Sequence, residues 1–334
     1  MGLKLGMSFG NDNIYVARLL ENGEAEIVYN QKAAIYIDDD VIAIGDEAYT
    51  MFNKTDNWPN FVRCLRIDFE NTVTTSNKTY SQEDMITLII KKVIDDIKEK
   101  YKEEVDSLTF ASKAYETHYD LSKIANCIYK AGIKEGQLFF KPYPCAIADY
   151  LKQKGIINNE QNLLIFDLGL KTCGFTLVDN QSKIIGYRED CMMGTADLCS
   201  SLYQLIVSKV CEESFMCYEE LTNDDEKLIR SLADEVLLTL SKKDNATINL
   251  KINEQDITIN IPREEFENAT EYFTSRVMEM MDIAMKWGHK IDIVCLIGGG
   301  SNIPRFVKAM KAKYNISTYI EEHPEYTTAL AVTK

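Results

Sequence analysis

Histidine and tryptophan are scarce in this sequence, and long apolar runs are missing from it. It has three histidines and two tryptophans, and no stretch approaches the roughly 18–20 uninterrupted apolar residues that span a bilayer. Its nine cysteines are scattered and form no Cys-x-x-Cys pair. These absences argue against a zinc site and a membrane helix. They favour reduced, mostly buried thiols and a cytoplasmic protein, and the first residues lack the apolar segment of a secretory signal.

Positive charge is scarce too. The formal net charge is -15, from 37 Lys and Arg against 52 Asp and Glu. Because nucleic-acid phosphates are bound by clustered Lys and Arg, this balance argues against a nucleic-acid partner. Hydrophobic residues make up 46% of the 334 residues, which is enough for two domains with a core each.

One plan of strands and helices occurs twice along the chain. Apolar runs at 3–9 and 14–19 flank a Gly-Asn-Asp-Asn cluster and predict a β-hairpin, and runs at 163–166 and 173–178 repeat this pattern around Gly169. Further expected strands are 107–111, 137–140, 184–188, 247–252, 257–261 and 293–297, and expected helices are 81–97, 119–131, 145–154, 196–210, 224–240, 262–287 and 303–313. The repetition predicts an α/β protein with two similar lobes, 1–158 and 159–334, each with a sheet flanked by helices.

Three glycine turns follow short apolar strands. They contain Gly10, Gly169 and the run Gly298-Gly299-Gly300. Backbone N–H groups at such turns bind anions without a charged side chain, although a lone glycine turn is usually ordinary turn chemistry. The sequence has no Gly-x-x-x-x-Gly-Lys-Ser/Thr motif, and the triple glycine lacks the acidic residue of a dinucleotide fingerprint. The order of the three turns is therefore more informative than any one of them.

In that order the turns resemble the phosphate-1, phosphate-2 and adenosine motifs of the actin and seventy-kilodalton heat-shock superfamily. Residues 6–11 resemble G-I-D-L-G-T, residues 165–172 resemble I-F-D-L-G-G-G-T, and residues 292–305 resemble D-I-V-L-V-G-G-S-T-R-I-P-K. Shorter matches near residues 44–48, 131–133, 142–148 and 193–197 fall in the same order. The resemblance therefore covers nearly the whole chain and identifies it as a member of the heat-shock branch.

This resemblance implies a two-lobed actin-like ATPase fold, built from duplicated ribonuclease-H-like domains with mixed sheets. It implies ATP or ADP with Mg²⁺ as cofactor, and an empty site is an equally open alternative. The residues that it places at the nucleotide are Gly10, Asn11, Asp12, Asp167, Gly169, Lys171, Thr172, Gly194, Gly298, Gly299, Gly300 and Asn302. The candidate catalytic residues are Asp167, Asp197 and Arg63, and Asp167 is also the candidate metal ligand, acting through water.

The sequence departs from the family at catalytic positions. Ser8 stands where the family has an aspartate, Lys141 where it has a glutamate, and Arg63 where it has a lysine that orients the attacking water. Other departures are Leu170 and Lys171 in place of glycines in the phosphate-2 turn, and Leu237 and Leu238 in place of basic residues around the adenosine. Because groups that act as one unit lose most of their effect together, we expect little or no ATP hydrolysis.

The same resemblance suggests a partner. Phe9-Gly10-Asn11 and Arg63 are similar to the atypical heat-shock-70 subunit of the ribosome-associated complex. This implies a chaperone or co-chaperone subunit that works with a zuotin-type J-protein on the ribosome, or with another chaperone. The sequence ends where the family's nucleotide-binding domain ends, so we expect no peptide-binding domain and no clamp on client peptides. The alternatives are an active ATPase or small-molecule kinase on the same fold, and a filament-forming actin relative, for which no matching insertions are found.

Overall fold

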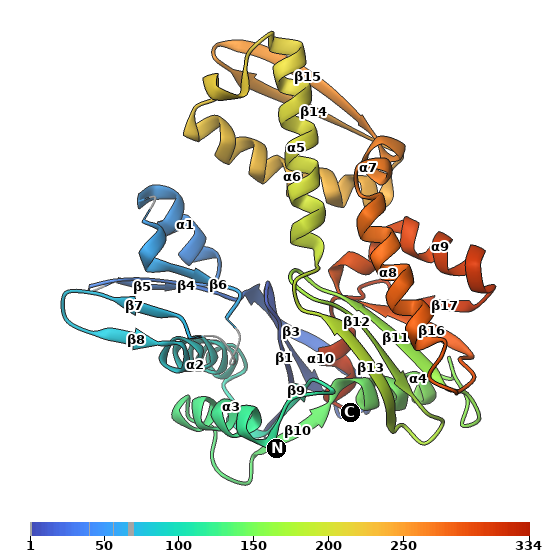
Figure 1. The fold of residues 1–334 in the computed structure, drawn as a ribbon. Coiled ribbons are helices and arrows are strands. Elements are labelled where there is room, and N and C mark those ends of the chain that lie inside the picture. Colours follow the sequence, from blue (N-terminus) through green and yellow to red (C-terminus); the bar gives the residue numbers. More distant parts are fainter. Residues whose placement is uncertain (1, 40, 56, 66–69) are drawn as a thin grey trace. The chain divides into compact units, whose positions relative to one another are not determined.

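The computed structural model describes residues 2–39, 41–55, 57–65 and 70–334, and they form two compact units (Figure 1). The first unit comprises Met1–Leu163, Val178–Ile185 and Glu325–Lys334, and the second comprises Leu164–Leu177 and Gly186–Pro324. The predicted lobes 1–158 and 159–334 are continuous ranges, whereas the units are not, because Glu325–Lys334 carries the last helix back to the first unit. The boundary between the lobes therefore stays a prediction.

The main sheet of the first unit is mixed. Its strand order is β10 (Leu138–Pro142), β9 (Val105–Ser112), β1 (Leu3–Phe9), β2 (Asn13–Leu19) and β3 (Ala25–Lys32). Strand β1 pairs antiparallel with β2 and parallel with β9. The first strand of the unit therefore lies at the centre of the sheet, with its hairpin partner on one side and a later strand on the other.

The main sheet of the second unit repeats this order. It runs β17 (Ser317–Ile320), β16 (Ile293–Ile297), β11 (Leu163–Leu168), β12 (Cys173–Val178) and β13 (Ile184–Asp190). Again the first strand, β11, is central, the next two strands in sequence lie on one side, and two later strands lie on the other. The duplicated plan read from the sequence is thus present as two sheets of one topology, and the expected α/β fold is confirmed.

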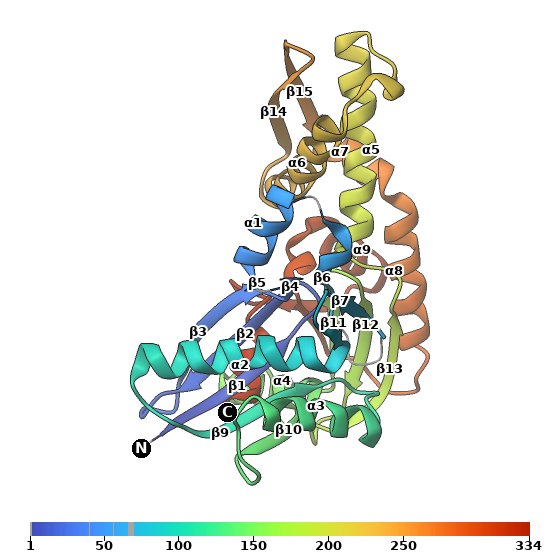
Figure 2. The same ribbon diagram turned by 90° about the vertical axis from the view of Figure 1, so that its left-hand side faces the viewer.

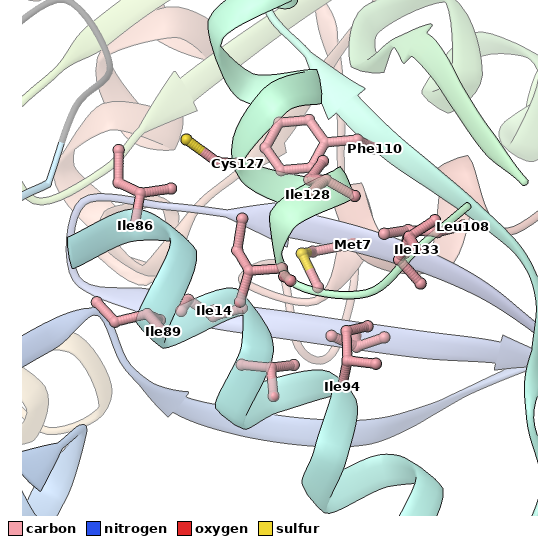
Figure 3. Packing of buried hydrophobic residues seen from close by; sticks show 14 of the residues in the cluster. Met7, Ile14, Ile86, Ile89, Ile94, Leu108, Phe110, Cys127, Ile128 and Ile133 are labelled. Carbon is pink, nitrogen blue, oxygen red and sulfur yellow. The ribbon is translucent and has the colours of Figure 1, made fainter. Parts of the chain in front are cut away.

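Alternation along β1 separates two packed faces. Leu5 and Met7 belong to a core that they share with α2 (Gln82–Tyr101) and α3 (His118–Lys130). Figure 3 shows Met7 among side chains of these helices. Ser81 caps the N-terminus of α2, and its side chain accepts from the Asp84 N–H in a reciprocal capping box. Gly6, between Leu5 and Met7, points to the opposite face, where a Cβ would lie 2.1 Å from Oγ1 of Thr333. That face carries α10 (Thr327–Val332), which contacts α4 (Tyr143–Gln153).

A smaller part of the first unit is built on short strands. Its three-stranded sheet has the order β5 (Val41–Ile44), β4 (Ala34–Asp38) and β6 (Phe61–Arg63), and α1 (Asp46–Thr55) contacts it. The 3-10 helix η1 (Trp58–Asn60) precedes β6, and β7 (Thr72–Thr74) pairs with β8 (Thr79–Ser81). Aromatic side chains pack on one another here: the ring of Phe52 stacks on Phe61 at 4.6 Å, and Trp58 lies edge-on to Phe52 at 4.4 Å. The sequence pattern gave no signal for these strands, because each is too short for a period of two to stand out.

Helices α8 (Glu271–Ala284) and α9 (Pro304–Tyr314) contact each other in the second unit. Phe306 of α9 lies 5.8 Å from Phe166 of β11 and 5.8 Å from Phe273 of α8, ring centre to ring centre. These rings join the helices to the sheet. None of the helices in the described ranges has the length and apolar character that a membrane crossing requires.

Beyond this sheet lies a second layer of the same unit (Figures 1 and 2). It consists of α5 (Thr195–Ser214), the 3-10 helix η2 (Tyr218–Glu220), α6 (Asn223–Lys242) and the hairpin of β14 (Asn245–Ile252) and β15 (Gln255–Pro262). Every second residue of β14 is buried, and β14 and β15 contact α6 and α5. The alternation in the sequence therefore reflects a hairpin that is covered by helices on one face.

The prediction of one continuous helix over residues 262–287 is wrong. It is two helices, α7 (Arg263–Ala269) and α8, separated at Thr270, where φ is -110° and ψ is 18°. The Thr270 hydroxyl donates to the Phe266 carbonyl at 2.8 Å, so the side chain itself satisfies the end of α7. Trp287 lies beyond α8, against Gly186 of β13, where a Cβ would come within 2.6 Å of the indole ring.

Candidate functional site

The first glycine turn joins β1 to β2. Gly10 N–H donates to the Asn13 carbonyl at 3.0 Å. A Cβ on Gly10 would lie 2.9 Å from that carbonyl oxygen, closer than real Cβ contacts, so the tight turn requires glycine. The predicted residues Gly10, Asn11 and Asp12 thus form one short loop at the end of the central strand.

Asp12 is the charged residue of this loop. Its Oδ2 accepts from Asn13 Nδ2 at 2.8 Å and from Lys32 Nζ at 2.9 Å. Its carbonyl accepts from the Ala33 N–H at 2.7 Å. Lys32 comes from the end of β3, two strands away along the chain. The first turn therefore carries a carboxylate that a cation of the same sheet holds in place.

Arg63, at the end of β6, lies close to the same group of charges. Burial raises the pKa of the Tyr49 hydroxyl, and a hydrogen bond from Arg63 opposes that shift. The charges of Asp12 and Lys32 act on the same hydroxyl. The predicted residues Arg63 and Asp12 are therefore brought together around Tyr49, a residue that the sequence analysis missed. The only sequence signal near Tyr49 is the family match at residues 44–48, which ends one residue before it.

The second glycine turn, between β11 and β12, closes as the first does. Gly169 N–H donates to the Thr172 carbonyl at 2.9 Å, and Thr172 is buried. Lys171, between them, is exposed. The carbonyls of Gly169 and Leu170 then accept from the first two N–H groups of α5, Thr195 at 2.9 Å and Ala196 at 3.0 Å. The start of α5 is thus fixed against the turn by backbone bonds.

Gly194 and Asp197 complete that junction. A Cβ on Gly194 would lie 2.2 Å from the Leu170 carbonyl oxygen, so no other residue fits without moving the backbone. The Asp197 carboxylate accepts from the Gly194 N–H at 2.8 Å. Its observed contact is that of a helix cap, which stabilises the N-terminus of α5. A catalytic role for Asp197 stays a prediction.

The triple glycine packs against the end of β11. Gly298 has φ 81° and its N–H donates to the Pro324 carbonyl at 3.1 Å. A Cβ on it would lie 2.5 Å from the Leu168 carbonyl oxygen and 3.0 Å from Asp167 Oδ1. A Cβ on Gly300 would clash with the Leu168 and Thr195 side chains, whereas one on Gly299 meets nothing within 4 Å. Asn302, the last residue of η3 (Gly299–Asn302), is exposed.

Asp167 is the carboxylate at the centre of this second group. Its Oδ1 would lie 3.0 Å from a Cβ on Gly298. Its negative charge also acts on the buried thiol of Cys173 at the start of β12. Burial raises the pKa of Cys173 well above its ordinary value, and the negative charge of Asp167 adds to that shift. The second unit therefore brings together seven of the predicted nucleotide residues, which are Asp167, Gly169, Lys171, Thr172, Gly194, Gly298 and Gly300.

Lys141 lies on β10, away from any glycine turn in the sequence. Its Nζ is 3.3 Å from Asp149 Oδ2 of α4, and both side chains are partly exposed. A cation with its own carboxylate partner thus stands where the resemblance leads one to expect a glutamate. Ser8, the other departure, lies on β1 opposite Tyr15 of β2.

No group of three or more His, Cys, Asp or Glu side chains arranged to hold a metal ion occurs among the described residues. Each glycine turn contributes at most one carboxylate, Asp12 or Asp167, and Asp12 is engaged by Lys32. These donors do not make an inner-sphere Mg²⁺ site, so no chemical step is assigned to a metal here. The turns suit a phosphate anion better, because they offer backbone donors and the exposed ammonium of Lys171.

Two sheets of one topology, each with a glycine turn after its central strand, define the class of actin-like ATPase folds. A family model described as Hsp70 protein matches residues 43–322, so the chain belongs to the Hsp70 family. It is 22% identical over 353 residues to the chaperone protein DnaK of Mycoplasmopsis agalactiae, with 98% of this chain and 57% of the relative covered. It is 24% identical to the chaperone protein dnaK1 of Prochlorococcus marinus, covering 93% and 52%. With DnaK of Thermus thermophilus it shares 23% identity, covering 70% and 39%.

The chain spans about half the length of the curated relatives that it matches most extensively. The family is therefore shown, and the recognition made from the sequence motifs is confirmed. The activity and partners of those longer proteins come to this chain only as proposals.

Proposed function

We propose that this chain is a divergent Hsp70-type nucleotide-binding domain that binds ATP or ADP with little or no hydrolysis and serves as a chaperone or co-chaperone subunit. Membership of the family and the two similarly closed glycine turns support nucleotide binding. The proposed contacts in the first unit are Gly10, Asn11 and Asp12, and those in the second are Asp167, Gly169, Lys171, Thr172, Gly194, Gly298, Gly299, Gly300 and Asn302.

The phosphate groups would be bound mainly by backbone. Gly10 and Gly169 use their own N–H groups to close the turns, which leaves the N–H groups of the following turn residues as the donors for an anion. Lys171 would supply the positive charge. The open space beside Gly299 is suited to a flat group packed against backbone.

The observation that carries the loss of hydrolysis is the ion pair of Lys141 with Asp149. ATP hydrolysis needs carboxylates that place the metal's waters and the attacking water. At Lys141 the resemblance predicts such a carboxylate, and the chain has a paired ammonium group. Asp12, the only carboxylate of the first turn, is bound to Lys32. Since the expected carboxylate is replaced by Lys141 and Asp12 is paired with Lys32, hydrolysis should be much slower than in a typical family member.

Two measurements test the two halves of this proposal. Thermal unfolding with ATP or ADP, each with and without Mg²⁺, tests binding, because a site filled to 100 times its dissociation constant stabilises by about 2.7 kcal/mol. Phosphate release in a single turnover tests hydrolysis. A raised unfolding midpoint with no phosphate release supports the proposal. No shift with any nucleotide overturns the binding half, and release at rates normal for the family overturns the other half.

We further propose a J-protein of the zuotin type, with the ribosome, as partner of this subunit. This rests on the resemblance of Phe9-Gly10-Asn11 and Arg63, and the position of Arg63 near the first glycine turn is compatible with it. Co-sedimentation of the tagged chain with ribosomes, with and without its J-protein, tests the assignment. Absence of the chain from the ribosome fraction in both cases contradicts it and favours another chaperone as partner.

A second candidate function is an active ATPase or small-molecule kinase. The position of Asp167, at the end of a buried strand and beside the triple glycine, is the observation that favours it. A carboxylate there is suited to organise a metal's waters or to accept a proton. Phosphate release, or transfer of labelled phosphate to a sugar or other small hydroxyl compound, decides between this function and the first.

A further inference from the structure

A pocket lies in the second unit, at the C-terminal end of α5. Its volume is about 680 Å³. Its lining comes from the last turns of α5, from η2 and from the short segment that joins them, and includes Tyr203, Val207, Cys211, Met216, Cys217 and Tyr218. Most of these side chains are apolar or aromatic. None of the residues proposed to bind nucleotide lines this pocket.

Phe215, next to the pocket-lining residue Met216 in the sequence, has an unfavourable backbone conformation and an unfavourable exposure of its side chain. Its side chain is 96% exposed, and as the C-cap of α5 it has φ 57°. A left-handed C-cap is normally glycine or asparagine, because other side chains are strained there. An exposed phenylalanine gains nothing from burial, so in the free chain neither its conformation nor its apolar surface is compensated. Tyr218, 48% exposed, extends the same apolar surface.

The rim of the pocket is strongly acidic. Residues 211–226 contain seven Asp and Glu and no Lys or Arg. Glu213 and Glu219 are exposed, and Glu219 is part of the lining. The next basic residues are already engaged: Lys227 lies 3.8 Å from Asp224, and the Arg230 guanidinium lies 4.1 Å above the Tyr203 ring. Arg230 also lies 3.7 Å from Glu226, so Asp224 and Glu226 each have a cationic neighbour. The exposed Glu213 and Glu219 carry the negative charge that the rim presents around an apolar floor.

Tyr218 adds a polar contact to this rim. Its hydroxyl donates to Glu226 at 2.9 Å, and this hydrogen bond raises the pKa of Tyr218 to about 12. The ring is thus neutral at physiological pH and held by its hydroxyl. A neutral tyrosine face next to carboxylates suits a Lys or Arg side chain, which gains both a cation–π contact and ion pairs.

We propose that this surface is a docking site for a basic segment of a partner protein, which seats one apolar or aromatic side chain in the pocket and places Lys or Arg against the acidic rim. The charge of the rim selects this occupant. Nucleic acids and anionic membranes carry negative charge and are repelled by it. A second copy of the chain in a symmetric dimer would bring the same acidic segment against itself, which costs energy through like-charge contact. A basic peptide meets both the apolar floor and the rim.

The test uses a fluorescein-labelled lysine-rich peptide with one central tryptophan, measured by fluorescence anisotropy with the full chain at low salt. The expected result is saturable binding that weakens as salt is added. Two matched peptides, one with the tryptophan replaced by serine and one with the lysines replaced by glutamate, should each bind roughly tenfold more weakly or not at all. Equal binding of the serine peptide, or equal competition by spermine, would show charge attraction alone and overturn the pocket.

Variants of the chain locate the site. Phe215→Gly, and the double variant Glu213→Lys with Glu219→Lys, should each weaken binding by roughly tenfold. The double variant Glu264→Lys with Glu322→Lys makes the same change in net charge at exposed positions outside the pocket lining, and should leave the affinity within about twofold at physiological salt. Circular dichroism checks that each variant is folded. An equal loss of peptide affinity in both double variants, or no loss in either, overturns the proposal. The proposal is also overturned if sedimentation shows a dimer of the chain that persists at high salt and that Phe215→Gly abolishes.

Discussion

The ammonium group of Lys32, at the end of β3, lies 2.9 Å from the carboxylate of Asp12. Asp12 belongs to the first glycine turn of the proposed nucleotide site. The two side chains are 37% and 33% exposed, so the pair itself contributes little to stability, at most about 1 kcal/mol. Its effect on a ligand is larger in principle, because a carboxylate in a phosphate-binding turn repels the phosphates and its cation offsets that repulsion.

Replacing Asp12 with asparagine should therefore raise nucleotide affinity. Asn keeps the shape and can still accept from Lys32, but it removes the negative charge, and Lys32 then faces the phosphates unopposed. We expect affinity for ATP to rise by roughly tenfold, measured by calorimetry. Lys32→Gln is the matched control and should lower it, since Asp12 then lacks its cation. If both variants bind as the wild type does, the first turn does not contact phosphate.

The difference between what the sequence predicts and what it misses is clear at this turn. A glycine between two apolar runs is a local signal that predicts the turn of Gly10, Asn11 and Asp12, and the family resemblance places these residues at the nucleotide. Lys32 and Tyr49 were not predicted, because their place beside Asp12 depends on the pairing of β2 with β3 and on the packing of α1, which no local pattern encodes. The helix break at Thr270 was missed for a related reason. The apolar stripe continues through Thr270, so no local pattern signals that this residue leaves the helical conformation (φ -110°, ψ 18°).

The triple glycine provides a paired test of backbone packing. Gly298→Ala should destabilise the chain by about 2–4 kcal/mol, because φ is 81° and the new Cβ would lie 2.5 Å from the Leu168 carbonyl. Gly299→Ala should change the free energy of unfolding by less than about 1 kcal/mol, since that side is open. Urea unfolding measures both. A mild effect at Gly298 would mean that the end of β11 adapts easily.

Restoring the carboxylates that the family resemblance predicts should raise hydrolysis. In Ser8→Asp with Lys141→Glu, acidic groups return to both positions, and we expect single-turnover phosphate release to rise by roughly tenfold or more. Because Lys141 pairs with Asp149 at 3.3 Å, the new glutamate would face that carboxylate, so Asp149→Asn is added to remove the repulsion. Ser8→Asn with Lys141→Gln and Asp149→Asn is the uncharged control. Equal rates in both sets of variants would place the defect elsewhere, with Leu170 and Lys171 as the next candidates.

The buried thiol of Cys295 should make the free energy of unfolding depend on pH in the alkaline range. Burial, with a smaller effect from the charge of Glu321, raises the pKa of this thiol from its ordinary 9.0 to about 12. The folded state therefore keeps a proton that the unfolded chain loses above pH 9, so its contribution is intact below pH 9 and falls by at most about 1.4 kcal/mol per pH unit up to the folded pKa. Other groups titrate there too, so the measurement is the difference in unfolding free energy between wild type and Cys295→Ala, from pH 8 to 11. A difference that stays constant with pH contradicts the burial effect.

Phe215 connects the stability of the free chain to the proposed docking pocket. Since its side chain is 96% exposed and its φ is 57°, Phe215→Gly should remove strain without loss of packing and raise the free energy of unfolding by about 1 kcal/mol. Lys102, the C-cap of α2 with φ 56°, is the matched control. Lys102→Gly should stabilise by a similar amount and leave binding of the basic peptide unchanged, whereas Phe215→Gly should stabilise the chain and weaken that binding. Thermal unfolding and fluorescence anisotropy on the same preparations measure both quantities. If Phe215→Gly destabilises the chain, the phenylalanine is packed in the free protein and the apolar surface offered to a partner is smaller than proposed.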